Sequence, residues 1–253
     1  MAARRVLVHY HIFKNAGTSV DVALQRSFGA RWAPFEGSDA HDTQSSEQLG
    51  AFLESRPDVV AVSSHLARPP LPFPGCRPIV LLRHPLLRAR SVYQFTRKDE
   101  SQHASGIARG GDFAGYVRWA LEQGRDEGGV VIRDYQVIHL SQASFRGHIL
   151  QAHANPADLD EVKELLESWG IFGIVEGYAH SARRFQRAFA LDTPELDFTD
   201  VWANRTRSEP PNIARQTSAI AEELGGDLFE RLVEANRLDL ALYDWAVGAL
   251  GHW

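Results

Sequence analysis

Four mainly apolar runs of strand length alternate with longer segments of helical character along the chain. The runs cover residues 6–13, 59–63, 79–83 and 171–175. None of them alternates strictly between apolar and polar positions, as a strand with one face in water would. Uninterrupted runs are typical of parallel strands that are covered on both faces. We therefore expect an α/β fold with a parallel sheet, formed as a single domain over residues 1–253.

Helical periodicity fills most of the remaining sequence. It is clearest near the middle, where Leu159, Val162 and Leu166 recur at the spacing of one helix face. Residues 30–43 and 97–111 have the composition of loops, and the second segment is expected to be exposed and mobile because glycine and serine are mixed with charges. The expected helices cover residues 20–28, 46–55, 86–95, 113–123, 135–141, 156–169, 179–190, 213–224 and 228–250.

Composition and charge exclude several classes of protein. The 253 residues are 44% hydrophobic and 23% charged, which is ordinary for a compact globular chain. The formal net charge of -5 gives no basic field that would attract nucleic acid, so any anion site has to be local. Cys76 is the single cysteine, which excludes an internal disulfide and a multi-cysteine zinc site.

The apolar segments are too short for a membrane. No stretch approaches the ~18 apolar residues of a spanning helix. His9, His11 and Lys14 interrupt the apolar start of the chain too early for a signal peptide. We expect a cytoplasmic protein without a membrane span.

The first candidate for chemistry is the polar segment from Phe13 to Ser19, between the first strand and the first helix. A loop at a helix N-terminus presents unpaired backbone N–H groups to an anion. Gly17 allows close approach, Thr18 and Ser19 supply hydroxyl groups, and Lys14 supplies a full charge. The alternative is a simple strand-to-helix turn in which Thr18 or Ser19 caps the helix.

A nucleoside triphosphate loop of the Walker type is incomplete here. That loop needs Gly-Lys-Ser/Thr at its end, whereas Gly17 is followed by Thr18 and the lysine stands at the start of the segment. An atypical P-loop kinase for a small molecule therefore remains an alternative, but the loop disfavours it.

The segment His11-Ile12-Phe13-Lys14-Asn15-Ala16-Gly17-Thr18-Ser19 resembles the His-Ile-Pro-Lys-Thr/Asn-Ala-Gly-Thr-Ser loop of sulfotransferases that use 3′-phosphoadenosine 5′-phosphosulfate (PAPS). Phe13 stands where that family usually has proline. The resemblance implies a three-layer α/β/α fold with a central parallel sheet, like that of P-loop nucleotide kinases. It also implies that the 5′-phosphosulfate is bound by Lys14, Asn15, Ala16, Gly17, Thr18 and Ser19.

A second segment, Arg83-His84-Pro85 followed by Ser91-Val92-Tyr93, resembles the Arg-Asp-Pro and Ser-x-Tyr elements of the same family. The resemblance implies that Arg83 and Ser91 bind the 3′-phosphate, and guanidinium can pair bidentately with phosphate. His84 stands where many members have aspartate. The alternative for Arg83 is an ordinary salt bridge.

His65 follows the second strand in Ser63-Ser64-His65-Leu66. A lone histidine is more often structural, but ligands of parallel sheets gather where strands end. The position is similar to that of the general base in the uronyl 2-O-sulfotransferase-like branch, so the resemblance implies that His65 deprotonates the acceptor and that Lys14 assists the leaving phosphate. An unperturbed histidine titrates near pH 6.5 and suits that role.

The remaining signals are weaker. Residues 204–208 resemble a late basic loop that closes over the nucleotide, so Arg205 and Arg207 are candidate ligands, with a solvated turn as the alternative. His9 and His11 share a strand face, but the other histidines lack ligand-like spacing, and we expect no metal.

Taken together, the resemblance implies a soluble, bacterial-type sulfotransferase. It would move the sulfuryl group from PAPS to a hydroxyl of a sugar, lipid or small natural product and release 3′-phosphoadenosine 5′-phosphate (PAP), without a metal. The alternatives are the small-molecule kinase and a non-catalytic nucleotide-binding protein of the same fold.

Overall fold

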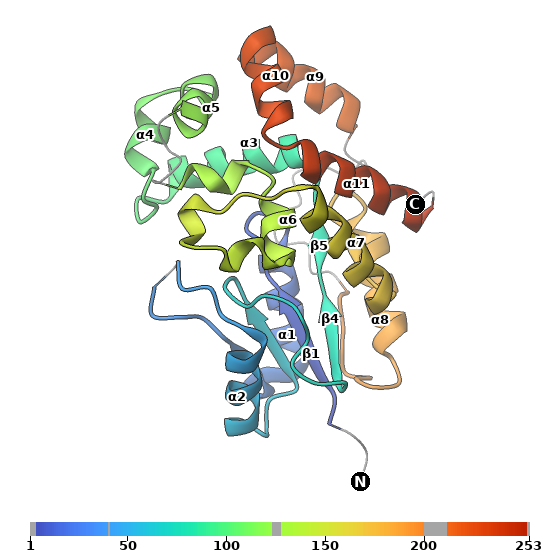
Figure 1. Cartoon of the computed structure of the whole chain (residues 1–253). Helices are drawn as coiled ribbons and strands as arrows, with labels where there is room; N and C mark the ends of the chain where they lie inside the picture. The colour runs from blue at the N-terminus through green and yellow to red at the C-terminus, as the bar shows by residue number, and fades with distance from the viewer. Residues whose placement is uncertain (1–3, 40, 123–127, 200–211, 252–253) are drawn as a thin grey trace. The chain divides into compact units, whose positions relative to one another are not determined.

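The computed structural model in Figure 1 describes residues 4–39, 41–122, 128–199 and 212–251. The chain divides into two compact units. The first, which we call the α/β unit, contains residues 1–82 and 162–208 together with Trp253, and the second, the helical unit, contains residues 83–161 and 209–252. Both units are therefore discontinuous in sequence.

The described strands all lie in the α/β unit and pair in parallel. Four of them are hydrogen-bonded in the order β2-β3-β1-β4, and β5 pairs with β6. The register sets Leu7 opposite Ala61 and Tyr10 opposite Ser64, so β1 and β3 end at the same edge. The expected α/β fold with a central parallel sheet is thus confirmed. The strands are β1 (Val6–Tyr10), β2 (Trp32–Pro34), β3 (Ala61–Ser64), β4 (Cys76–Ile79), β5 (Leu81–Leu82) and β6 (Gly173–Ile174).

Both faces of β1 are covered, and all five of its residues are buried. Leu7 belongs to a hydrophobic cluster that the sheet forms with α1 (Gly17–Phe28) and α8 (Tyr178–Phe189). Tyr10 points to the opposite face, because side chains alternate along a strand. There it stacks on Trp169, the last residue of α7 (Pro156–Trp169), with ring centroids 5.5 Å apart. This two-sided burial is why the strand segments read as uninterrupted apolar runs.

Local sequence signals fix the ends of two helices in the α/β unit. α2 (Ser46–Ser55) begins at a capping box, in which the Gln48 amide donates to the Ser45 hydroxyl oxygen while the Gln48 side chain accepts from the Ser45 amide. α1 ends at Phe28 because Gly29 has a φ of 54°, a left-handed conformation that glycine adopts without steric cost.

The helical unit packs its helices around aromatic side chains and one buried arginine. The ring centroids of Phe113 and Tyr116 lie 5.4 and 5.5 Å from that of Tyr93. Arg88 is fully buried and donates to the Val131 carbonyl at 2.6 Å. The helices that lie wholly in this unit are α3 (Pro85–Lys98), α4 (Ser105–Gly110), α5 (Phe113–Glu122), α6 (Tyr135–Leu140), α9 (Ile213–Leu224), α10 (Gly226–Glu234) and α11 (Arg237–Leu250).

Two buried carboxylates cap α6 and α11 reciprocally. Asp239 of α11 accepts from the amides of Gln136 and Val137 in the first turn of α6, at 3.1 and 2.9 Å. Asp134, just before α6, accepts from the amides of Leu238 and Asp239, both at 2.8 Å. Burial and the neighbouring Asp239 raise the pKa of Asp134 to about 7. The first turn of each helix is therefore capped by a carboxylate about 100 positions away in the chain.

Three local expectations were wrong. Residues 97–111 contain the helix α4, whose Ala108 is completely buried, so tertiary packing overrides a loop-like composition. The apolar segment 79–83 is split between β4 and β5, and the expected helix 228–250 is broken into α10 and α11. At that break the buried Asn236 side chain donates to the carbonyls of Ile132 and Leu232.

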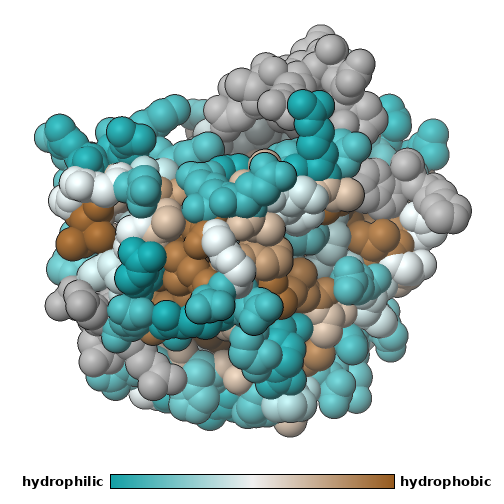
Figure 2. Space-filling model, turned by 90° about the horizontal axis from the view of Figure 1, so that it is seen from above, coloured by the Kyte–Doolittle hydropathy of each residue, from teal (hydrophilic) through white to brown (hydrophobic). Residues whose placement is uncertain are grey.

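Hydrophilic side chains cover much of the face that Figure 2 presents, and hydrophobic ones gather toward its middle. Among the helices of the described residues, none is both long and apolar enough to cross a membrane. Among the residues that the structure describes, the exposed large hydrophobic side chains are those of Val22, Ile107, Phe145 and Leu191.

Candidate functional site

Three strands of the α/β unit deliver polar side chains to one edge of the sheet. In the register, Pro34 of β2 lies opposite Ser63 and Tyr10 of β1 lies opposite Ser64 of β3. The residues that follow these strand ends, Glu36, His11 and His65, therefore gather at the carboxyl edge, where parallel sheets bind ligands. The rings of His11 and His65 stack there with centroids 3.8 Å apart.

The loop between β1 and α1 has the backbone of an anion cradle. Lys14 and Ala16 have φ angles of 66° and 60°, in the left-handed region that residues other than glycine rarely adopt. Such strained positions cluster at ligand-binding sites, and left-handed residues in succession with right-handed ones turn backbone N–H groups toward a common concavity. The buried Asn15 side chain fixes the loop by donating to the Leu81 carbonyl of β5 at 2.7 Å.

The N-terminus of α1 is open to an anion. Its cap residue is Ala16, whose methyl side chain makes no capping hydrogen bond, and its first turn contains no acidic residue. The helix begins at Gly17, so Thr18 and Ser19 lie inside its first turn and neither is the cap. The alternative of a turn capped by one of these hydroxyls was therefore wrong. Thr18 is exposed, whereas Ser19 is 2% exposed and points into the protein.

Lys14 is half-buried, and its ammonium group lies over the Phe13 ring at 5.9 Å from the centroid. A cation at that distance from an aromatic face is attracted by the ring. The phenylalanine that replaces the proline of the resembled loop thus contacts the residue expected to carry the positive charge.

Gly17 lies directly against the ring of His11. A Cβ atom built on Gly17 falls 2.0 Å from His11 Cδ2 and 2.1 Å from His11 Nε2, closer than any side chain allows. The absence of a side chain at this position lets the first turn of α1 rest on the imidazole. His11 therefore connects the loop to His65, on which it stacks.

His65 is held by a carboxylate that the sequence did not reveal. Its Nδ1 lies 2.9 Å from Glu36 Oε1, and its backbone amide donates to the same oxygen at 3.0 Å. With Nδ1–H donating to Glu36, Nε2 is left as the basic nitrogen. Both side chains are partly exposed, at 45% for His65 and 38% for Glu36, so a substrate can reach them. Glu36 was missed because residues 30–43 were expected to be loop, while β2 in fact carries the chain to this edge.

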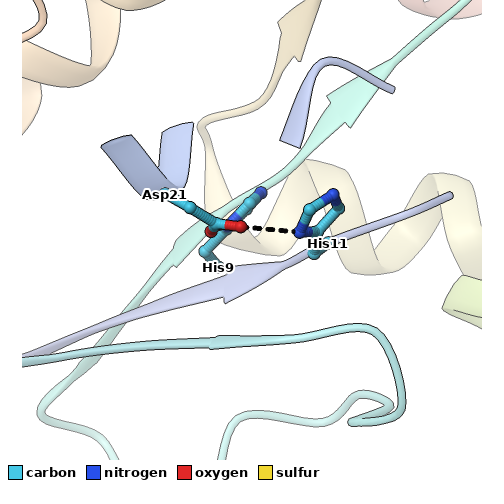
Figure 3. A group of neighbouring side chains, drawn as sticks. All are labelled: His9, His11 and Asp21. Atoms are coloured by element: carbon cyan, nitrogen blue, oxygen red, sulfur yellow. Dashed lines mark hydrogen bonds and ion pairs between the residues drawn. The ribbon is translucent and has the colours of Figure 1, made fainter. Parts of the chain in front are cut away.

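Behind the loop lies a cluster of His9, His11 and Asp21 (Figure 3). Asp21 Oδ1 is 2.9 Å from His9 Nδ1, and Asp21 Oδ2 is 2.9 Å from His11 Nδ1. Burial lowers the pKa of His11 to about 4 despite this carboxylate. Burial alone would raise the pKa of Asp21, but the hydrogen bonds with His11 and His9 outweigh it and hold that pKa well below its usual range. His11 is therefore neutral and Asp21 ionised at pH 7.

Arg83 and Ser91, which are expected to bind the 3′-phosphate, belong to the helical unit. Arg83 directly follows β5, and its backbone is clamped by the buried Gln136 side chain, which accepts from the Arg83 amide at 2.8 Å and donates to the Arg83 carbonyl at 2.9 Å. Ser91 lies on α3 and is half-buried. Arg205 and Arg207 lie outside the described residues.

His84, the N-cap residue of α3, lies edge-on to Tyr243, with ring centroids 5.2 Å apart. Burial lowers the pKa of His84. The histidine that replaces the aspartate of the resembled motif is thus disfavoured as a cation and packs as a neutral ring.

Comparison with known proteins adds one relative and no function. No family model matches the chain. An uncharacterized protein of Archaeoglobus fulgidus is 29% identical over 252 residues. The match covers 96% of this chain and 96% of that protein. The similarity extends over nearly the full length of both chains.

Proposed function

We propose that the protein is a PAPS-dependent sulfotransferase of the carbohydrate type, similar to the uronyl 2-O-sulfotransferase-like branch, with a P-loop nucleotide-kinase-like three-layer fold and a cytoplasmic location. The observation that carries the proposal is the loop of residues 13–19. It combines two left-handed residues, Lys14 and Ala16, with an uncapped helix N-terminus and a lysine at its start. This combination suits a sulfated phosphate without the magnesium ligands that a nucleoside triphosphate requires.

His65 acts as the general base in this proposal. An acceptor hydroxyl gives its proton to His65 Nε2 while its oxygen attacks the sulfur atom of PAPS. The imidazolium that forms is stabilised by Glu36, which already accepts the hydrogen bond from Nδ1. The sulfuryl group moves to the acceptor oxygen as its bond to the 5′-phosphate oxygen breaks.

The loop stabilises the departing phosphate. Negative charge develops on the former bridging oxygen, and Lys14 neutralises it while backbone N–H groups within residues 15–19 hold the other oxygens. The groups at Ala16, Gly17 and Thr18 suit this role best, because the Asn15 and Ser19 amides already donate to the Ile12 and Ala16 carbonyls. Arg83 and Ser91 anchor the 3′-phosphate, and Gln136 fixes the Arg83 backbone for that purpose. Arg205 and Arg207 add positive charge to the same phosphate. Fixed cations are sufficient for this transfer, so the reaction as proposed has no step on a metal.

The binding half of the proposal is tested by calorimetric titration of PAP, ADP, and ATP with magnesium. We expect metal-independent binding of PAP in the micromolar range and its loss in Arg83→Ala. Arg97→Ala is the matched control, because it removes the same side chain from an exposed position on α3. A preference for ATP with magnesium over PAP would reject the sulfotransferase and favour the kinase.

The catalytic half is tested by transfer of labelled sulfate from PAPS to a panel of hydroxyl compounds. Lys14→Ala should lower kcat more than it weakens donor binding, and Arg83→Ala should do the reverse. Glu36→Gln and His65→Gln should each lower kcat, with His65→Gln costing about 10²–10⁴-fold as for a general base. Binding of PAP without transfer to any member of a broad panel would favour the non-catalytic nucleotide-binding protein.

A further inference from the structure

We propose that His9, His11 and Asp21 form a binding site for a divalent transition-metal ion, with Zn²⁺ as the best fit, and that the ion clamps the two ends of the anion loop together. The site is independent of the sulfotransferase proposal, because it follows from these three side chains alone. Neither the transfer step nor the nucleotide enters the argument.

The fold places the three ligands on both sides of the loop. His9 and His11 are two positions apart on and just after β1, so their side chains leave the same face. Asp21 lies in the second turn of α1, which packs on that face. One nitrogen from each imidazole and one carboxylate oxygen all lie within 4.8 Å of one another. Figure 3 shows the two rings directed at the carboxylate from neighbouring positions.

The ligand atoms lie within reach of a common ion. Zinc binds histidine nitrogen and carboxylate oxygen at about 2.0–2.2 Å, which sets neighbouring ligand atoms about 3.3 Å apart. His9 Nδ1 lies 2.9 Å from Asp21 Oδ1 and His11 Nδ1 lies 2.9 Å from Asp21 Oδ2, and one atom from each residue lies within 4.8 Å of the others. The side chains therefore have to close around the ion by at most about 1.5 Å.

Charge and ligand chemistry also favour a dication. The cluster holds one carboxylate between two imidazoles, and the ion-pair partners of Asp21 among the described residues are those two histidines. His9 is 2% exposed and His11 7% exposed, so the carboxylate charge is only partly screened by water. Two imidazoles and one carboxylate form a three-ligand set of the kind that zinc accepts with a fourth position open.

Ser63 completes the surroundings of the site. Its hydroxyl oxygen lies 3.1 Å from His9 Nδ1 and accepts a hydrogen bond from the Trp32 indole at 3.0 Å. That oxygen therefore lies beside the His9 nitrogen that would bind the ion, where it adds a polar group to the surroundings of the site.

The position of the site gives the ion a structural role. Its ligands flank the loop directly, with His11 two residues before Phe13 and Asp21 two residues after Ser19. A bound ion ties the end of β1 to α1 and so restrains the left-handed residues Lys14 and Ala16 between them. Binding should accordingly raise the melting temperature, because an ion that binds the folded state alone stabilises it.

The test titrates Zn²⁺ alone into tag-free protein that has been stripped with a chelator, and repeats the titration with Co²⁺ as a spectroscopic probe. We expect one ion per chain, a Co²⁺ spectrum typical of four- or five-coordinate nitrogen and oxygen ligation, and a higher melting temperature. Asp21→Asn should weaken Zn²⁺ binding by more than about 100-fold. Asp39→Asn is the matched control, because Asp39 forms an ion pair with one exposed histidine, His41, at 2.9 Å. This substitution should leave Zn²⁺ binding unchanged.

Two results would overturn the proposal. One is the absence of stoichiometric Zn²⁺ binding by the folded wild-type chain, which needs no variant and so cannot be confused with misfolding. The other is Zn²⁺ binding of equal strength in wild type and in Asp21→Asn, which would place the ion elsewhere. Neither result depends on PAPS or an acceptor, so the outcome is separate from that of the sulfotransferase test.

Discussion

Replacing Gly17 by alanine should destabilise the protein through a single contact, the one with His11. The added Cβ falls 2.0 Å from His11 Cδ2, whereas real Cβ atoms do not approach a neighbour more closely than 3.0 Å. The ring therefore has to retreat by about 1 Å, the difference between these two distances. It has little freedom to do so, because Asp21 binds it at 2.9 Å and His65 stacks on it at 3.8 Å.

The size of the effect follows from those two restraints. Forcing an extra methyl group into a packed site costs about 1–3 kcal/mol. Loss of a hydrogen bond to a charged partner such as Asp21 adds about 1.5–3 kcal/mol if the ring is fully displaced. We therefore expect Gly17→Ala to lower the free energy of unfolding by about 3 kcal/mol. The backbone itself does not oppose alanine, since Gly17 is not among the positions with positive φ.

A double-mutant cycle isolates the contact. Urea unfolding, followed by circular dichroism in the presence of a chelator, is measured for wild type, Gly17→Ala, His11→Ala and the double variant. In the His11→Ala background the clash is gone, so Gly17→Ala should cost less than about 0.5 kcal/mol. Gly106→Ala is the matched control, because its added Cβ in α4 meets nothing within 4 Å beyond its chain neighbours and the backbone of its own helix, and alanine should gain about 0.5–1 kcal/mol there.

Equal costs of Gly17→Ala in both backgrounds would refute this reasoning. The penalty would then arise from the backbone of the loop rather than from the imidazole. His11 would no longer be the link between the anion loop and His65.

Three further outcomes are expected. Burial lowers the folded-state pKa of His11 to about 4, so the stability that this residue contributes is present above its unfolded pKa near 6.5 and is lost as pH falls toward 4. The difference in unfolding free energy between wild type and His11→Gln, measured in chelator, should therefore shrink over that window by up to about 3 kcal/mol. The raised pKa of Asp134 gives a slope of opposite sign, but both proteins share it. Gln136→Met should leave the Arg83 amide and carbonyl without their buried partner, and so lower the unfolding free energy by about 1–3 kcal/mol and weaken PAP binding in calorimetry. Unchanged PAP binding would show that the Gln136 side chain does not position Arg83. Ser45→Ala removes the capping box of α2 and should cost about 1 kcal/mol in urea unfolding, with no effect on PAP binding.

Where the chain carried strong local signals, the sequence was sufficient to predict the elements. The apolar runs 6–13, 59–63 and 171–175 each contain or overlap a strand, and the helix expected over residues 46–55 has the bounds of α2. The short strand β2 was missed, because three residues are too few to show a period. The break between α10 and α11 was missed as well, since it depends on a hydrogen bond from Asn236 to the distant Ile132 carbonyl.

The candidate site was predictable in part for the same reason. The order of charged and small residues in 13–19 is local, and it falls at the β1–α1 junction as expected. Glu36 and Asp21 were not foreseen. Each reaches its histidine only when the parallel register and the packing of α1 bring separate segments together. No spacing along the sequence indicates such a pair in advance.

The reciprocal caps of α6 and α11 have a consequence for synthesis of the chain. Gln136 leaves the ribosome 103 positions before Asp239, the residue that caps its helix. At about 5–20 residues per second this interval is roughly 5–20 s. During that time the first turn of α6 has exposed amides and the Asp134 carboxylate lacks its partners on α11. The helical unit therefore completes its fold only after α11 has been made, and a chain truncated before α11 should be degraded rather than accumulate as a partial domain.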